Sequence, residues 1–455
     1  MSTTRRTFLR QVVALGPAAM VFWLETNSGF SMMQDPECTL PDFTNAVELI
    51  PDERTVGTRY SAAEMDTMSG PLGKLREAFK KIRDLSTANP NDVIGWTKQV
   101  AQHCIHCGGG RTGPNQIHYS RKFLPWHRAY LYVVERILRK LSSDDSLRLV
   151  YWNWENSNSR VVPSIFTPAG QSLYWSNRGN FPPSDWPLPN TSVDVRTPLL
   201  IPDFLTFGGG GPGQTSAAYS GAHANVHNAF RPSGDMRNLL LSPRDPLFYA
   251  HHGNIDRLWS SWARIHSAEH KKTDFGTDRA YFYDEERKLR FIQFNNVKDE
   301  TKLGYKYSSY MQPATPVNRL ERFAVARTGA EFTINDAAVR KMARIHGPRV
   351  LVVRNIRNLE KFPEARTFGI FADQPASGTP SSQDPLFLGT VATVFSAETH
   401  EETGPLTAAL DVSDKLPVLA KGNHKMSLVI APLDADGKTA APGIPVAAEN
   451  VSLIE

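Results

Sequence analysis

The sequence has only three cysteines, no long run of lysine or arginine, and no internal repeat. An odd number of cysteines leaves one thiol without a disulfide partner if the protein is exported. Arg5, Arg6 and Arg10 against Glu25 contribute +2 of the formal net charge of +5, and the remaining +3 is too little to predict nucleic-acid binding. With 40% hydrophobic and 21% charged residues the composition is ordinary for folded domains, so disorder is not expected.

Long apolar runs are also scarce, and the only one of note lies in residues 1–34. There Arg5-Arg6 precedes the apolar stretch Val12–Leu24, which is too short to favour a membrane span. The pattern predicts a twin-arginine signal peptide of a bacterial type, export in the folded state, and a periplasmic or secreted protein without stable membrane insertion. The other interpretation is a basic tail on a cytosolic protein.

Histidine, by contrast, is concentrated in two stretches. The two sets of histidines are His103, His118 and His127, and then His223, His227 and the pair His251-His252. His223 and His227 are four residues apart, so they share one face of a helix and can hold one ion. His118 and His127 are nine apart, which predicts two segments separated near Pro125. Two sets of three imidazoles predict two facing metal ions.

The type of ligand narrows the choice of metal. Imidazoles without a carboxylate favour copper, zinc or iron over magnesium or calcium. Buried imidazoles also need partners for their ring nitrogens, and metal ions supply them. A dinuclear zinc hydrolase is the competing interpretation, but such sites usually include a bridging carboxylate, and the sequence has none at ligand spacing.

The length of 455 residues allows two or three domains. Helices are predicted over residues 71–85, 92–104, 123–141, 222–230 and 245–266, with a long irregular segment over 158–213. These helices predict a mainly α catalytic domain, a four-helix bundle with inward ligands, over residues 35–318. Short strands over 349–356, 367–372, 386–395 and 425–431 then predict an all-β sandwich domain over 319–455.

At this point the sequence resembles the type-3 copper proteins, namely tyrosinases, catechol oxidases and haemocyanins. It is most similar to the plant-type polyphenol oxidases. The motifs that carry the resemblance are 102–107, 123–128, 234–236, 245–248, His251-His252 with Asp256-Arg257, 282–285 and 303–307. They cover most of the chain from about Cys38 to its end. The resemblance implies a dicopper centre with dioxygen as co-substrate.

Carried over by position, the resemblance assigns six copper ligands. They are His103, His118 and His127 for one ion, and His223, His227 and His252 for the other. His251 is the alternative to His252. The resemblance also implies a thioether between Cys107 and His118 and a disulfide between Cys38 and Cys104. Three reduced thiols, or a Cys104–Cys107 bridge, are the alternatives.

The resemblance further implies the reaction. The expected function is oxidation of small phenolic substrates, o-diphenols, to o-quinones with water as by-product. Leu239 stands where related enzymes carry a residue that gates the site; core packing is its other interpretation. Asp256 is either an acceptor for a ligand imidazole or a buried partner of an arginine. The C-terminal domain is expected to cover the active site.

Monophenol hydroxylation is less favoured by the sequence. Related enzymes that hydroxylate monophenols often carry asparagine at the position of Ala224, working with an acidic residue to hold a water. No Asp or Glu lies between Phe204 and His223, although Asn228 offers a related amide. A full tyrosinase is therefore the alternative function. A dioxygen carrier is a further one, disfavoured by the export signal.

Overall fold

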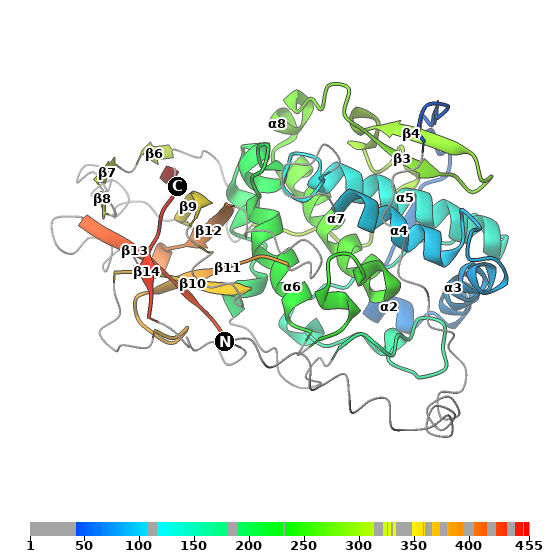
Figure 1. The fold of residues 1–455 in the computed structure, drawn as a ribbon, viewed down its shortest axis with the longest axis horizontal. Coiled ribbons are helices and arrows are strands. Elements are labelled where there is room, and N and C mark those ends of the chain that lie inside the picture. Colours follow the sequence, from blue (N-terminus) through cyan, green and yellow to red (C-terminus); the bar gives the residue numbers. More distant parts are fainter. Residues whose placement is uncertain are drawn as a thin grey trace, which may run out of the picture. The chain divides into compact units, whose positions relative to one another are not determined.

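The computed structural model describes residues 42–107, 116–179, 190–230, 233–313 and, between further gaps, parts of 322–454. Long helices form its first part (Figure 1). They are α3 (Ser69–Ala88), α4 (Trp96–Cys107), α5 (Phe123–Ser142) and α7 (Leu247–Ile265), accompanied by the short helices α2 (Ala62–Asp66), α6 (Ala224–Asn228) and α8 (Ser267–Lys272). The predicted helical catalytic part is confirmed.

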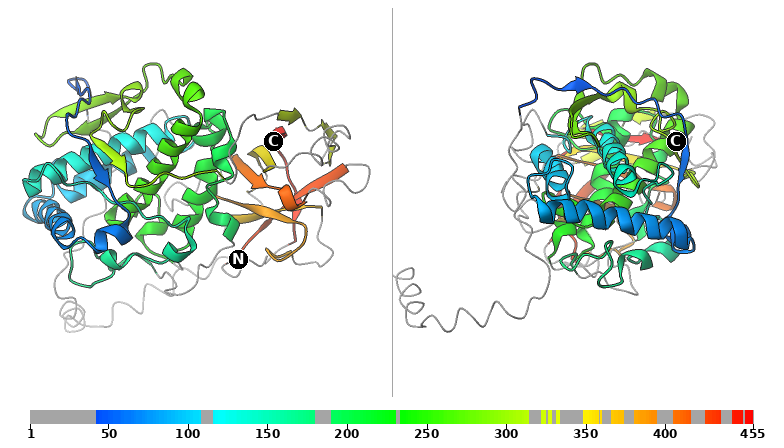
Figure 2. Two further views of the ribbon diagram at one scale, coloured as in Figure 1. Left: turned by 180° about the vertical axis from the view of Figure 1, so that it is seen from behind. Right: turned by 90° about the vertical axis from the view of Figure 1, so that its right-hand side faces the viewer.

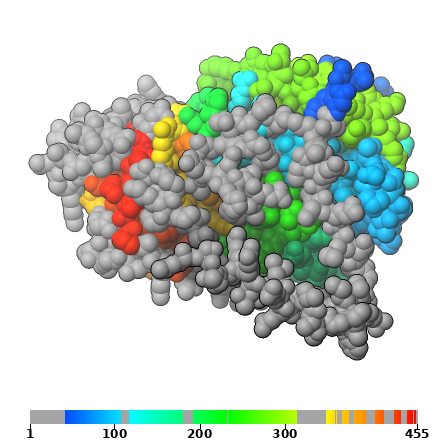
Figure 3. All heavy atoms as spheres, viewed as in Figure 1, coloured from blue at the N-terminus to red at the C-terminus, as the bar shows by residue number. Residues whose placement is uncertain are grey.

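Burial explains which helices lie at the centre. Helix α5 buries nearly every side chain, and so does α7 up to Trp262, as expected for helices surrounded by others. Helix α3 buries one stripe, Leu72, Leu75, Phe79 and Ile82, and exposes the opposite face. In Figure 3 its blue atoms form part of the molecular surface. The central helices α5 and α7 pack against each other, and both carry clustered histidines.

The helices differ from the predictions in two details. Helix α5 begins at Phe123, as predicted, but Pro125 lies inside its first turn and not at a break. Proline is tolerated there because the first amides of a helix have no intrahelical acceptor. Helix α6 is shorter than expected, because a π-helical turn, η6 (Tyr219–His223), precedes it and Gly221 departs from helical backbone angles.

Small sheets tie the ends of this region together. Strand β4 (Leu289–Gln293) lies between β1 (Val47–Glu48) and β3 (Arg279–Tyr283). Strand β2 (Gly57–Arg59) pairs in parallel with β5 (Tyr305–Tyr307), so an early segment is joined to a late one. Strand pairing therefore joins segments from the start of the helical region to segments from its end.

The C-terminal part consists of strands, as predicted, and two larger sheets build it (Figure 2). Their strands are β6 (Arg322–Ala324), β7 (Ala326–Thr328), β8 (Glu331–Thr333), β9 (Val350–Ile356), β10 (Thr367–Ala372), β11 (Phe387–Ala392), β12 (Leu406–Asp411), β13 (Lys425–Pro432), β14 (Ile444–Pro445) and β15 (Asn450–Ile454). One sheet has the order β11-β10-β13-β8-β7, with β14 also on β13, and the other has the order β12-β9-β15-β6. Leu351, Ile370, Val391 and Leu428 meet in a shared core. The predicted β-sandwich is confirmed.

Two predicted boundaries fall outside the described residues. The signal peptide assigned to residues 1–34 is one, and the domain border at residue 318 is the other. Both stay predictions. Among the helices that the structure does describe, none has the length and apolar character needed to cross a bilayer.

Candidate metal centre

The first histidine cluster combines three different segments. His103 comes from α4, His118 from the loop before α5, and His127 from the first turns of α5. All three are buried, and each offers a ring nitrogen within 4.8 Å of the others. The Nε2 atoms of His103 and His127 lie 3.4 Å apart. The structure thus brings together the three residues predicted for the first metal.

Main-chain carbonyls hold these rings in place. Nδ1 of His127 lies 2.7 Å from the carbonyl oxygen of Phe123, one turn earlier on α5. The ring of His103 bonds to the main chain of Leu239. A ring nitrogen that donates to a carbonyl leaves the other nitrogen with its lone pair turned to the cluster. This is the usual way in which metal-binding imidazoles are oriented.

The second cluster contains four histidines, not three. His223 ends the π-helical turn η6, His227 lies on α6, and His251 and His252 lie on α7. Their ligand atoms also lie within 4.8 Å of one another. Nδ1 of His227 is 2.5 Å from the carbonyl oxygen of Met236, which again leaves Nε2 for the cluster.

The two clusters adjoin. The rings of His127 and His252 stack with their centroids 4.2 Å apart and an interplanar angle of 10°. His118 and His223 face each other at 6.1 Å and 28°. Two ions held in the two clusters would therefore be near neighbours, which suits a ligand that bridges both. Both groups consist of histidine alone in the chain segments that the structure describes.

Burial keeps these imidazoles neutral. Loss of solvation lowers the pKa of His127 to about 3 and that of His227 to about 4, and it holds the pKa values of the others well below 6.5. A neutral ring keeps a lone pair, which metal ligation requires. The deficit is largest in the second cluster, where both ring nitrogens of His223 and His252 and Nε2 of His227 are buried without hydrogen-bond partners. Bound metal ions would remove that deficit, so the residues fit the implied copper pair.

Asp256 contacts arginines and not imidazoles. Its carboxylate binds the guanidinium groups of Arg128 and Arg59 and accepts hydrogen bonds from Tyr305 and Tyr307. The prediction that it orients a ligand imidazole is wrong, and the alternative of a buried arginine pair holds. The reason is location: Arg128 follows His127 on α5, and Asp256 lies one turn after His252 on α7, so the pair joins the two central helices behind the histidines.

The role predicted for Asn228 is not decided by its contacts. Its amide nitrogen donates to the main-chain carbonyls of Thr393, at 2.9 Å, and Arg366, at 3.3 Å, both in the strand region. Its Oδ1 is buried without a hydrogen-bond partner, so the water-holding role stays a prediction. Ala224 is buried at the start of α6. Leu239 is buried as well, and the gate role assigned to it stays a prediction.

The cysteine predictions fall largely outside the described residues. Cys104 is fully buried and disulfide-bonded. Cys38 and the side chain of Cys107 are not described, so the Cys38–Cys104 pairing and the thioether to His118 stay predictions. His106, between the two cysteines, is buried beside Trp126 and lies in neither cluster.

Two groups of contacts around the second cluster were not predicted. Nε1 of Trp154 donates to Nδ1 of His251 at 3.1 Å. Nδ2 of Asn225, between His223 and His227, donates to the carbonyl of Ser192 at 3.1 Å and lies 3.4 Å from the hydroxyl of Thr390 on β11. Both connect residues far apart in the chain, and no local sequence pattern indicates such pairs.

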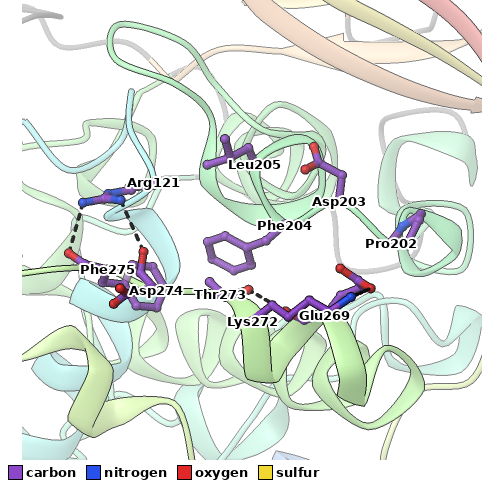
Figure 4. A pocket seen from close by; sticks show the side chains of 10 residues that line it. All are labelled: Arg121, Pro202, Asp203, Phe204, Leu205, Glu269, Lys272, Thr273, Asp274 and Phe275. Atoms are coloured by element: carbon purple, nitrogen blue, oxygen red, sulfur yellow. Dashed lines mark hydrogen bonds and ion pairs between the residues drawn. The ribbon is translucent and has the colours of Figure 1, made fainter.

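A separate cavity of about 270 Å³ lies away from the histidines (Figure 4). Phe204 projects into it, with Leu205 beside it, while Lys272 and Glu269 come from α8. Arg121 on its rim bonds to the carbonyls of Asp274 and Phe275. None of the clustered imidazoles lines this cavity, so it is no part of the metal centre.

Comparison with known proteins adds to this geometry. Residues 93–186 and 184–265 match the common central domain of tyrosinase, and these ranges contain all seven clustered histidines. A chloroplastic polyphenol oxidase of Vitis vinifera is 33% identical over 281 residues, 53% of this chain and 46% of that protein. A chloroplastic polyphenol oxidase E of Solanum lycopersicum is 28% identical over 60% of this chain and 52% of its own length. The chain thus spans about half the length of the curated relatives it matches.

Solved structures show the same fold. A latent apple tyrosinase superposes with a TM-score of 0.64 at 20% identity, covering 89% of this chain and 100% of that one. A polyphenol oxidase from Grenache, Vitis vinifera, has a TM-score of 0.50 at 27% identity, over 63% of this chain and 94% of its own. The first likeness includes the strand region, and it shows the fold alone.

Proposed function

We propose that the chain belongs to the type-3 copper proteins of the tyrosinase and catechol oxidase family, and that it is a dicopper oxidase converting o-diphenols to o-quinones with dioxygen. Two diphenols would give up four electrons and four protons, and one dioxygen would become two waters. The observation that carries the proposal is the pair of adjoining clusters of buried, neutral imidazoles. It also rests on the similarity to proteins named polyphenol oxidase.

The proposed ligands are the residues that the structure brings together. His103, His118 and His127 would hold one copper, and His223, His227 and His252 the other. When bound, the copper pair supplies the site that accepts two electrons from the diphenol and passes them to dioxygen. The protein's own part is to hold six lone pairs in place: through the carbonyls of Phe123 and Met236, and through burial that keeps the rings unprotonated.

Preference for diphenols rests on what surrounds His223 and His227. A monophenol must lose its proton before an oxygen atom is added to the ring, and a positioned base or base-held water contributes roughly a hundredfold or more to such a step. Ala224 offers no polar group, and the amide nitrogens of Asn225 and Asn228 donate to Ser192, Thr390, Arg366 and Thr393. Among these amide atoms only Oδ1 of Asn228 is left to hold such a water.

The test is a ratio of rates with copper content measured alongside. The expected result is two coppers per chain and a kcat/KM for a diphenol about a hundredfold above that for the matching monophenol. A ratio near one would show a full tyrosinase, which is the second candidate. Two zinc ions and no diphenol oxidation would contradict the proposal altogether. Replacing Ala224 by Asn, with an acidic residue nearby, should move the ratio toward monophenols.

We propose export by the twin-arginine route, on the strength of Arg5-Arg6 and the apolar stretch after them. The curated relatives are named chloroplastic, which describes their compartment and not this protein's. Fusion of residues 1–34 to a folded reporter would test the route, and Arg5-Arg6→Lys-Lys should block export of the reporter.

A further inference from the structure

The second cluster holds one more imidazole than a metal with three ligands needs. His251 and His252 both reach it, and the resemblance assigns His252, with His251 as the alternative; burial and cluster membership do not choose between them. The hydrogen bonds do. His252 has both ring nitrogens buried without a partner, so either nitrogen can offer a lone pair to a metal. His251 is already engaged by Trp154.

The direction of that bond fixes where the proton of His251 sits. The indole Nε1–H of Trp154 can only donate, so Nδ1 of His251 has to be the acceptor. An imidazole that accepts at Nδ1 has no hydrogen on that atom, so its one N–H is on Nε2. Nε2 of His251 is thus an N–H donor and has no lone pair for a metal.

That N–H is buried beside the main chain of His223. Nε2 of His251 meets full hydrogen-bond geometry with no acceptor among the described residues, and the main chain of His223 is the nearest partner of the ring, with which a bound anion would share the donor. The ring itself packs between the proposed ligands, with centroids 5.4 Å from His223 and 4.7 Å from His227. Trp154 and His251 are both fully buried, so water does not compete for this donor in the closed site.

We propose that Trp154 locks His251 as a hydrogen-bond donor to anions bound at the second metal, and that His251 is not a metal ligand. The inference rests on the proposed dicopper site. An anion there, such as the phenolate oxygen of a substrate, would receive a charge-assisted hydrogen bond inside a site without bulk water. His251 would then be a substrate-positioning residue, and Trp154 would act through it.

The measurement is azide binding to the full-length, copper-loaded protein, followed by optical titration, with copper per chain determined for each variant. His251→Phe keeps a ring of similar shape and removes the donor. We expect two coppers per chain and azide affinity about tenfold weaker, the size expected for a lost hydrogen bond to a charged group. His251→Gln is the matched control, since its oxygen can accept from Trp154 while its amide N–H donates. It should keep most of the affinity.

Each other outcome is informative. One copper per chain in His251→Phe would make His251 a ligand and overturn the proposal, as would two coppers with unchanged azide affinity. A Gln variant as weak as the Phe variant would also overturn it. If His251→Phe fails to fold because Trp154 is left unpaired, the double variant with Trp154→Phe removes both partners and gives the same reading. Failure of the unmodified protein to bind two coppers would instead refute the proposed function.

Discussion

The two histidine clusters are alike in composition and differ in what supports them. The first draws its ligands from α4, α5 and the loop between them, and its rings bond to Phe123 and Leu239 of the helical region. The second includes α6, whose Asn225 and Asn228 bond to Thr390, Thr393 and Arg366 of the strand region. The first is therefore built within the helical region, and the second is built where the helical and strand regions are in contact. The second site is accordingly the one on which the strand region can act.

Removing one ligand from each cluster is the most severe test of this comparison. His127→Ala and His227→Ala should each leave about one copper per chain and abolish diphenol oxidation, because neither half of the pair can supply two electrons alone. Copper content and oxygen uptake check this. His266→Ala is the control, since His266 lies in neither cluster and bonds to the carbonyl of Leu199. Full copper and activity in either cluster variant would refute the ligand assignment.

The clusters share one support, and breaking it should affect both. Asp256→Asn removes the charge that pairs Arg128 and Arg59, all of them buried. A buried arginine left without its partner typically costs about 3–5 kcal/mol in the free energy of unfolding. Denaturant unfolding measures this. Asp84→Asn, in an exposed pair with Lys80, should change stability little. Equal effects of the two variants on stability would mean that the buried pair does not join helices α5 and α7.

Acid should lower the stability of the metal-free protein through both clusters, but to different extents. Unfolded histidines take up protons below pH 6.5, whereas folded His227 does so only near 4 and His127 near 3. The unfolded state thus binds more protons as pH falls through this window, so stability is present above pH 6.5 and is lost below it. At pH 5 each imidazole should cost the metal-free protein about 2 kcal/mol.

Thermal unfolding of the metal-free protein between pH 7 and pH 4 checks this expectation. His227→Phe and His127→Phe should each flatten the pH dependence. In the His127 variant the flattening should extend to lower pH, because the pKa of folded His127 is lower than that of folded His227. A metal-free protein equally stable at pH 7 and pH 5 would contradict neutral burial.

Of the four changes considered, cutting the chain near residues 313–318 should have the smallest effect. That effect should be confined to the second cluster. The strand region is expected to cover the active site, so its removal should raise the rate on a bulky diphenol severalfold. Limited proteolysis with a rate assay on cleaved and intact protein measures it. A trimmed protein that keeps both coppers and is no faster would show that the strand region is structural only.

Sequence reasoning worked where chemistry is local. The spacing of His223 and His227, and the motifs around His127 and His252, predicted the residues that the fold brings together, and periodicity predicted the helices and strands. It failed where partners are distant. The contact of Trp154 with His251 spans 97 residues and that of Asn228 with Thr393 spans 165, and no periodic pattern records such pairs. Asp256 was left with two roles because its arginines come from other segments.

The parallel pair of β2 and β5 has a consequence for biosynthesis. Arg59 binds Glu135 and Asp256 and lies against the ring of Tyr305, so the contacts of this early segment are complete only once the last segment of the helical region has been made. At about 5–20 residues per second, a ribosome would need roughly ten to fifty seconds to make the chain between them. All the clustered histidines emerge during that interval. The imidazoles are thus exposed to the cell's metals before the region around them can close.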